Sequence, residues 1–170
     1  MLTFLSGSLR RSSLQVAFLA GSRNTFTQTF VPFPLIDNSL GGVQFGIDGE
    51  GNYGYFGADG SLIPFKSGKL LFAAKFAYST KRDGNTCYSF SVDGIDKILI
   101  TGIALRSETG LYVVPNNNIT TDTSTTPSIS DSIATVISTT PLEVDVSNYD
   151  YITLMYYGGD QYITFKVESI

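Results

Sequence analysis

The sequence predicts an all-β fold, and three observations support this prediction. Apolar residues alternate with period two along most of the chain, and no stretch shows the 3.6-residue periodicity of an amphipathic helix. The apolar runs are short and are bounded by Gly, Pro, Asn and Asp, which favour turns. About a dozen runs of this kind fit into the chain. We expect one domain over residues 1–170, a two-sheet antiparallel β-sandwich for which the jelly roll is a candidate topology.

The N-terminal region, residues 1–40, holds two of these runs, SLQVAFLA and NTFTQTFVPF, and we expect it to act in assembly. Its first apolar stretch is split by Arg10-Arg11, which is the wrong order for an export signal. No apolar run reaches the roughly 20 residues that span a bilayer. The sequence therefore predicts neither a signal peptide nor membrane insertion.

The segment GIDGEGNYGYFGADGSLIPF predicts a three-stranded meander. We expect strands at 43–47, 53–56 and 62–65, joined by turns at 48–51 and 59–60. Tyr53 and Tyr55 share one face, whereas Gly54 on the other face leaves room for another backbone or a ring. Pro64 cannot donate to a ladder, so the last strand should lie at an edge or near a bulge.

A calcium loop is the alternative interpretation of this segment, because Asp48, Glu50 and Asn52 have the spacing of the first three ligands. The match then fails, since Tyr53 stands where the loop requires glycine and Asp59 where it requires a bidentate Glu. Turn formation is the favoured interpretation, because Asp and Asn beside Gly are common turn formers.

The later runs give the strongest strand predictions. In KLLFAAKFAYS, residues 70, 72, 74, 76 and 78 should face one way and residues 71, 73, 75 and 77 the other. Asp93-Gly94 predicts a hairpin between TCYSFSV and KILITGIAL, and Gly158 to Asp160 a hairpin between YDYITLMYY and QYITFKVES. Shorter strands are expected at 111–114, 133–137 and 142–146. Residues 115–132 are rich in Asn, Thr and Ser and predict a long loop, either mobile or held by a neighbouring subunit or receptor.

Composition argues against several classes of function. The chain has a net charge of −4 and only 15% charged residues, so it lacks the clustered Lys and Arg of a nucleic-acid-binding protein. The one cysteine, Cys87, cannot form an intramolecular disulfide and is expected to be buried and inert.

Enzymatic activity is the least favoured class. The sequence contains no His, which removes Ser-His and Cys-His nucleophiles. A carboxylate pair for glycoside cleavage could be drawn from Asp83, Asp93, Asp96 and Glu108. Each of these acids lies in a predicted turn, where such residues serve the backbone, so we expect no catalytic residue.

Two parts of the chain resemble modules of bacteriophage proteins. GNYGYF at 51–56, followed by Gly57-Ala58-Asp59 and then Ile63-Pro64-Phe65, resembles a short module of tail and fibre-like virion proteins from phages of gut bacteria. VDVSNY at 144–149 is similar to a strand-opening motif of phage β-sandwich domains. The chain departs from the first module at Gly60-Ser61, where Thr and Val are more frequent. The resemblance implies a structural role and carries over no residue of known chemical function.

These observations predict a non-enzymatic virion structural protein, a fibre, tail-tip or capsid-decorating subunit made in the host cytoplasm. It should form a homo-oligomer, with a trimer favoured, dock on other virion proteins and need no cofactor, with burial between chains replacing disulfides. The candidate interface residues are Phe30, Phe33, Tyr53, Tyr55 and Phe65.

A carbohydrate-binding module for a host surface glycan is the alternative function, because ten tyrosines could supply stacking platforms. The absence of tryptophan and the frequent use of Tyr in cores and interfaces weigh against it. The candidate receptor contacts are Asn116, Asn117, Asn118, Tyr156 and Tyr157.

Overall fold

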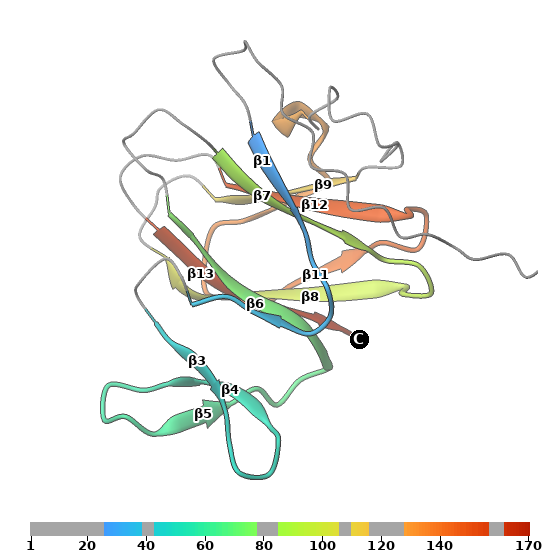
Figure 1. Ribbon diagram of the computed structural model, residues 1–170. Helices are drawn as coiled ribbons and strands as arrows, with labels where there is room; N and C mark the ends of the chain where they lie inside the picture. The colour runs from blue at the N-terminus through green and yellow to red at the C-terminus, as the bar shows by residue number, and fades with distance from the viewer. Residues whose placement is uncertain (1–25, 39–42, 78–84, 106–109, 116–127, 157–161) are drawn as a thin grey trace, which may run out of the picture.

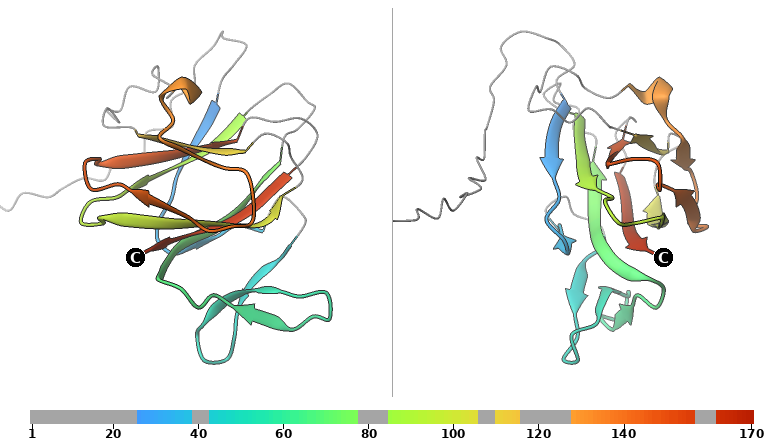
Figure 2. Two further views of the ribbon diagram at one scale, coloured as in Figure 1. Left: turned by 180° about the vertical axis from the view of Figure 1, so that it is seen from behind. Right: turned by 90° about the vertical axis from the view of Figure 1, so that its right-hand side faces the viewer.

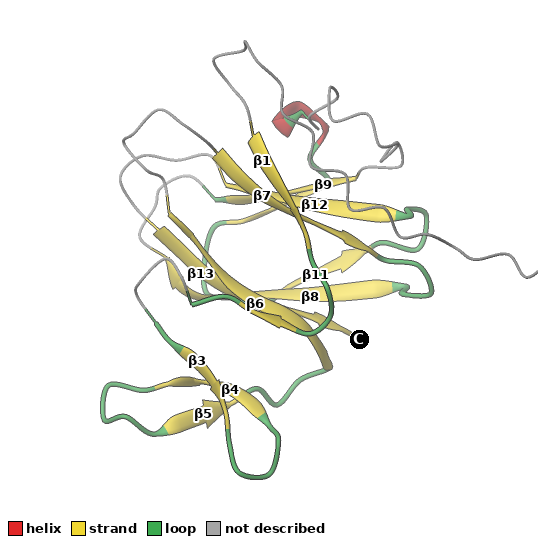
Figure 3. Ribbon diagram, viewed as in Figure 1, coloured by secondary structure: helices red, strands yellow, loops and turns green. Residues whose placement is uncertain are grey.

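The computed structural model describes residues 26–38, 43–77, 85–105, 110–115, 128–156 and 162–170. These residues are almost entirely in β-strands, with one short 3-10 helix, η1 (Ile129–Asp131) (Figure 3). The all-β prediction is confirmed. The strands are β1 (Phe26–Phe30), β2 (Leu35–Ile36), β3 (Phe45–Ile47), β4 (Tyr53–Phe56), β5 (Leu62–Pro64), β6 (Lys69–Ala77), β7 (Asn85–Ser91), β8 (Lys97–Leu105), β9 (Leu111–Pro115), β10 (Ala134–Val136), β11 (Leu142–Asp145), β12 (Tyr151–Tyr156) and β13 (Tyr162–Ser169).

The strands form two packed five-stranded sheets and a separate three-stranded one (Figure 1). Sheet A has the order β1-β7-β12-β9-β10, and sheet B has the order β11-β8-β13-β6-β2. Within them, β6 to β13 pair only antiparallel and pass from one sheet to the other at every connection except β9 to β10. Eight strands so arranged in two four-stranded sheets are a jelly roll. Strands β1 and β2 extend it, each parallel to its neighbour.

This topology corrects both predicted hairpins. The Asp93-Gly94 turn forms, with Ile95 N donating to Val92 O at 2.9 Å, but β7 belongs to sheet A and β8 to sheet B. Strands β12 and β13 are likewise in different sheets, and the residues from Gly158 to Asp160 lie outside the described ranges. Both of these connections cross between the layers, because both layers must contribute apolar faces to one core.

The core between the sheets is dense in aromatic rings. Phe72 and Phe76 of β6 pack against Tyr88 of β7 and Phe165 of β13, with ring centroids 4.8–5.9 Å apart. These residues are at most 2% exposed. The predicted period-two alternation in β6 therefore turns Phe72 and Phe76 into the core between the two sheets.

The pattern in β6 shifts at its start. Val167 of β13 is paired with Phe72 but Glu168 with Leu70, so Leu71 is an extra residue in a β-bulge. Leu71 therefore joins the core at 4% exposure, and Leu70 turns to the opposite face. The prediction that Leu70 shares a face with Phe72 is wrong for this reason.

The meander β3-β4-β5 forms as predicted and lies below the sandwich next to sheet B (Figures 1 and 2). A Cβ on Gly54 would lie 2.4 Å from the backbone oxygen of Ile63, so the close approach expected at this glycine is confirmed. Pro64 lies in the edge strand β5, as expected of a residue without a backbone donor.

Three further strand predictions and the burial of Cys87 are confirmed, and two other predicted segments lie outside the described residues. Strands β9, β10 and β11 fall within one residue of their expected places. The first N-terminal run and most of the predicted long loop, residues 116–127, lie outside the described ranges. Cys87 is buried, and burial raises the pKa of its thiol to about 12. In the described part of the chain, no helix is long and apolar enough to cross a membrane.

Candidate functional site

A cleft of about 350 Å³ opens between the meander and the outer face of sheet B. Its meander wall consists of Tyr55 from β4 together with Ile63, Pro64 and Phe65. Its opposite wall is formed by Thr101, Gly102 and Ile103 of β8 and by Lys166 of β13, with Lys66 and Thr139 completing the lining. A volume of this order lies within the range of small-molecule sites, about 300–1,000 Å³.

A buried ionic network fixes the meander to sheet B. The ammonium of Lys166 forms an ion pair with Oε2 of Glu168, and both side chains are at most 8% exposed. Ser67, at the end of the meander, donates to the same Oε2 at 2.8 Å and accepts from Lys166 Nζ at 3.1 Å. The ammonium also lies 4.7 Å from the centroid of the Phe65 ring, within cation–π range.

The meander wall of the cleft is aromatic. The rings of Tyr55 and Phe65 are stacked at 6.0 Å, and Phe45 lies at a tilt behind Phe65 at 6.2 Å. Phe45 is buried, whereas Tyr55 and Phe65 are half-buried. The buried ring therefore supports two rings whose faces line the cleft.

A second β-bulge shapes the opposite wall. Thr164 of β13 is paired with Ala104 and Phe165 with Gly102, so Ile103 is the extra residue. Bulges re-aim side chains, and this one places an isoleucine in the cleft lining. The two bulges described here both lie in strands that flank β13.

The outer face of sheet B contains every buried side-chain polar atom that lacks a hydrogen-bond partner in the described part of the chain. These atoms are Lys75 Nζ, Thr101 Oγ1, Thr164 Oγ1 and Glu168 Oε1. Lys75 and Thr164 are register partners, as are Thr101 and Lys166 across the other side of β13. Burial lowers the pKa of Lys75, and the charge of Asp37 partly opposes this shift. Thr101 also lines the cleft, although its Oγ1 is buried.

The predicted interface residues fall into two groups. Phe30 and Phe33 are 53% and 42% exposed beside the edge strand β1, although the Phe33 ring also contacts Phe90 at 6.0 Å. Tyr53, Tyr55 and Phe65 belong to one face of the meander and are half-buried. Tyr55 and Phe65 line the cleft, so the chain itself already covers part of their surface.

The predicted receptor contacts do not form a site within the described residues. Tyr156 is 3% exposed and stacks on Phe76 at 6.0 Å in the core, so its ring does not face outward, and its prediction as a receptor contact is corrected. Alternation in β12 turns it inward, with Ile152 and Leu154. Asn116, Asn117, Asn118 and Tyr157 lie outside the described ranges.

The acidic residues considered for metal binding serve the turns. Asp48 Oδ1 accepts from the backbone N–H groups of Glu50 and Asn52 at 2.9 and 2.8 Å, and Asn52 Nδ2 donates to Oδ2 at 3.0 Å. These bonds, led by that from the Asn52 side chain, lower the pKa of Asp48. Within the described ranges, no three His, Cys, Asp or Glu residues come together as a metal site.

The two described acids considered for glycoside cleavage, Asp93 and Asp96, do not line the cleft. Asp93 lies in the β7–β8 turn, where its backbone N–H donates to Ser91 Oγ at 3.2 Å. The backbone carbonyl of Asp96 accepts a hydrogen bond from the Val146 N–H at 2.8 Å. Asp83 and Glu108 lie outside the described residues.

Sequence reasoning missed Thr101, Ile103 and Lys166. The run TFKVES did show polar residues at every second position, which marks one face of β13 as polar. Nothing local in the sequence indicates that the meander covers this face, because the contact joins residues about a hundred positions apart.

Comparison of the chain with protein-family models, with curated proteins and with solved structures gives no match. The fold and the site therefore have to support any functional conclusion by themselves.

Proposed function

We propose that this chain is a non-enzymatic structural subunit of a bacteriophage virion, in a fibre, tail tip or capsid decoration, that assembles into a homotrimer. The observation that carries the proposal is the pair of unprotected edges of sheet A. No strand pairs with the outer side of β1 or β10 in the described part of the chain. A free strand edge is a template for pairing with another chain.

Both edges of sheet A also expose large apolar side chains. Phe30 and Phe33 flank the β1 edge, at 53% and 42% exposure. Ile133 and Ile137 flank β10 at the opposite edge, at 41% and 70% exposure. Apolar groups gathered at two edges of one sheet favour association through those edges.

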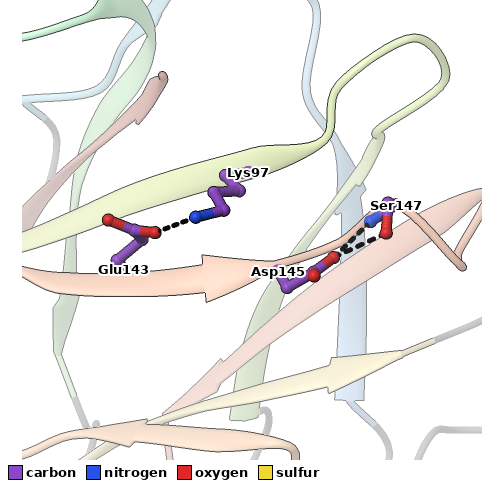
Figure 4. Close-up of polar contacts among 4 residues, drawn as sticks. All are labelled: Lys97, Glu143, Asp145 and Ser147. Atoms are coloured by element: carbon purple, nitrogen blue, oxygen red, sulfur yellow. Dashed lines mark hydrogen bonds and ion pairs between the residues drawn. The ribbon is translucent and has the colours of Figure 1, made fainter.

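Sheet B offers a contrast, because both of its edges are protected. On the β11 edge, Glu143 forms an ion pair with Lys97 at 2.5 Å, and Asp145 accepts from Ser147 N and Oγ at 3.0 and 2.6 Å (Figure 4). The other edge strand, β2, has only two residues. Charged and very short edge strands are two ways in which proteins prevent edge association.

The two edges of sheet A differ in sequence, so contact between them is heterologous, with β1 of one copy against β10 of the next. Heterologous contacts generate closed rings when the rotation between copies closes, and a trimer is a small ring of this kind. Docking on other virion proteins would use surfaces left free by the ring.

A carbohydrate-binding module for host attachment is the second candidate. The cleft favours it, because the cleft combines an aromatic wall with a threonine hydroxyl and a lysine. This role is compatible with assembly, since the cleft lies at sheet B and the apolar edges lie at sheet A.

The test of assembly is the solution mass of the chain by light scattering over a range of concentrations. We expect a trimer, and we expect Phe30→Asp and Ile137→Asp each to give monomers, because a charge would be buried in the contact. Ile170→Asp is the matched control, since Ile170 is also exposed, at 49%, but belongs to neither edge of sheet A. A wild-type monomer at every concentration would overturn the proposal, as would equal dissociation by the control.

A further inference from the structure

The cleft between the meander and sheet B has the features of a binding site for one kind of ligand. Lys66 and Thr139 of its lining are exposed, whereas Lys166 of β13 is buried. The Lys166–Glu168–Ser67 network fixes its two walls relative to each other. A preformed cleft held in this way loses little conformational entropy on binding a ligand.

The charge of the cleft selects for an anion. Among the described residues, its lining contains two lysines and no Asp or Glu, in a chain whose net charge is −4. Lys166 is neutralised by Glu168, whereas no ion pair joins Lys66 to any described residue. Lys66 can therefore pair with a negative group of a ligand, as a charge-assisted hydrogen bond.

The remaining lining selects for a ring with an apolar face and polar substituents. Tyr55 offers its half-buried ring beside Phe65, whose ring already carries the Lys166 ammonium at 4.7 Å. Thr101 Oγ1 is buried and out of reach of a ligand, whereas Thr139 of the lining is exposed, so the Thr139 hydroxyl can donate to or accept from a ligand hydroxyl. The C–H face of a pyranose sugar packs on an aromatic ring, while its hydroxyls form such bonds.

We propose that this cleft binds a carboxylated saccharide, a hexuronic acid unit of an acidic glycan. The sugar ring stacks on Tyr55, its hydroxyl groups bond to Thr139, and its carboxylate pairs with Lys66. A nucleotide fits less well, because phosphates are typically bound by glycine-rich loops at helix N-termini, and in the described part of the chain the only helix is the three-residue η1. The inference concerns a site apart from the assembly edges and does not depend on the oligomeric state.

The test is a titration of the full-length chain with trigalacturonate, followed by calorimetry and by saturation-transfer NMR. Maltotriose is the neutral comparison, a glucose trisaccharide without carboxylates. We expect trigalacturonate to bind at least about tenfold more tightly than maltotriose, and added salt to weaken it.

Three variants assign the contacts. Lys66→Gln should weaken trigalacturonate binding about tenfold and abolish the preference over maltotriose. Tyr55→Ala should remove binding of both sugars, and Thr139→Val should weaken both, because these residues contact the ring and not the carboxylate. Lys69→Gln is the matched control, an exposed lysine outside the cleft, and should bind like the wild type. Thermal unfolding and light scattering of each variant verify that fold and assembly are unchanged.

Three results would overturn the proposal. The first is the absence of binding to either sugar by a folded wild-type chain. The second is equal affinity for the acidic and the neutral sugar. The third is equal weakening by Lys66→Gln and Lys69→Gln, which would mean that the whole surface attracts the anion. Preferential binding of a mononucleotide would likewise replace the saccharide by a phosphate-bearing ligand.

Discussion

The outer faces of the two sheets differ in whether their buried polar groups are hydrogen-bonded. On sheet A, Ser89 and Thr153 are register partners, and their hydroxyls are hydrogen-bonded at 2.9 Å. Beside them Cys87, Val114 and Met155 form a small apolar cluster. On sheet B, the corresponding face buries Lys75 and the Lys166–Glu168 pair, and it holds all four unsatisfied polar atoms of the described chain.

This difference indicates which face is built only for stability. On the outer face of sheet A, the hydroxyls of Ser89 and Thr153 are hydrogen-bonded to each other, and the neighbouring side chains are apolar. This is the arrangement of a stable packed layer. Sheet B's outer face retains buried charges and unpaired hydroxyls, which lower stability because hydrogen bonds do not offset their desolvation. The cleft lies on sheet B, at the position where such groups meet the aromatic meander.

The largest expected effect on this comparison comes from Glu168→Gln. The substitution leaves the buried Lys166 ammonium without its countercharge, so we expect a loss of about 3–5 kcal/mol in the free energy of unfolding. Urea denaturation measures it. The exposed Lys97–Glu143 pair supplies the control, because its side chains are 49% and 51% exposed and Glu143→Gln should change little.

The double variant Lys166→Met/Glu168→Leu tests whether the buried pair stabilises the fold at all. Replacement of a buried ion pair by apolar side chains is often neutral or stabilising, and we expect most of the lost stability to return. A double variant as unstable as Glu168→Gln would mean that the network holds the meander in place by its geometry.

Met155→Ala is the matching change on sheet A. Met155 is fully buried, so we expect a loss of about 3 kcal/mol from the lost contacts and the cavity left behind. Ile47→Ala, at a side chain that is 55% exposed, should stay within about 0.5 kcal/mol of the wild type. Equal effects in the two variants would show that the sheet A cluster contributes nothing specific.

Lys75→Met should have a smaller effect of the opposite sign. Lys75 is buried with no hydrogen-bond partner for its ammonium, so an apolar side chain of similar length should stabilise the chain by about 2 kcal/mol at neutral pH. Thermal and urea unfolding measure this gain. A loss of stability would instead mean that the ammonium is well accommodated.

The pH dependence of Lys75 has a defined sign. Burial lowers its pKa below the usual 10.5 in the folded chain, so the unfolded chain binds this proton more strongly. The destabilisation is fully present below the folded pKa and disappears as the pH rises from that value to 10.5. The wild type should therefore approach the stability of Lys75→Met at alkaline pH, whereas Lys69→Met, at an exposed position, should show no such convergence.

The smallest expected effect concerns the reactivity of the Cys87 thiol, and it is measured on the wild-type chain without a substitution. Burial raises the pKa of its thiol to about 12, so the reactive thiolate is scarce at mildly alkaline pH. A disulfide reagent that yields a coloured product should leave the folded chain unmodified and react fully in concentrated urea. Rapid reaction of the folded chain would mean that the outer layer of sheet A opens locally.

Much of the strand layout was predictable from local sequence. The alternation in β6 and β8 and the turns at Asp48 and Asp59 were predicted because side-chain period and turn chemistry are local properties. The two hairpins were wrong, since a tight turn determines only where the chain reverses. Whether the next strand pairs with its predecessor or crosses to the other sheet depends on the layer that its apolar face must meet.

The two bulges were also beyond sequence analysis. One extra residue at Leu71 and one at Ile103 shift which side chains face the core. The local sequence pattern is compatible with either orientation of the side chains that follow the bulge. Pairing with β13 determines which of these side chains face the core. The bulge at Ile103 matters most for the site, because it helps to form the cleft.

Local sequence was sufficient to predict an all-β chain, the places of most strands and turns, a buried Cys87 and a compact meander. The three-dimensional structure was needed to show that successive strands alternate between sheets as a jelly roll. It also decided that Tyr156 is in the core and that Tyr55, Thr101, Lys66 and Lys166 share one cleft. Side-chain alternation and turn chemistry depend on interactions over a few residues. Strand pairing and the cleft bring together residues far apart in the sequence, and their contacts depend on burial of the whole core.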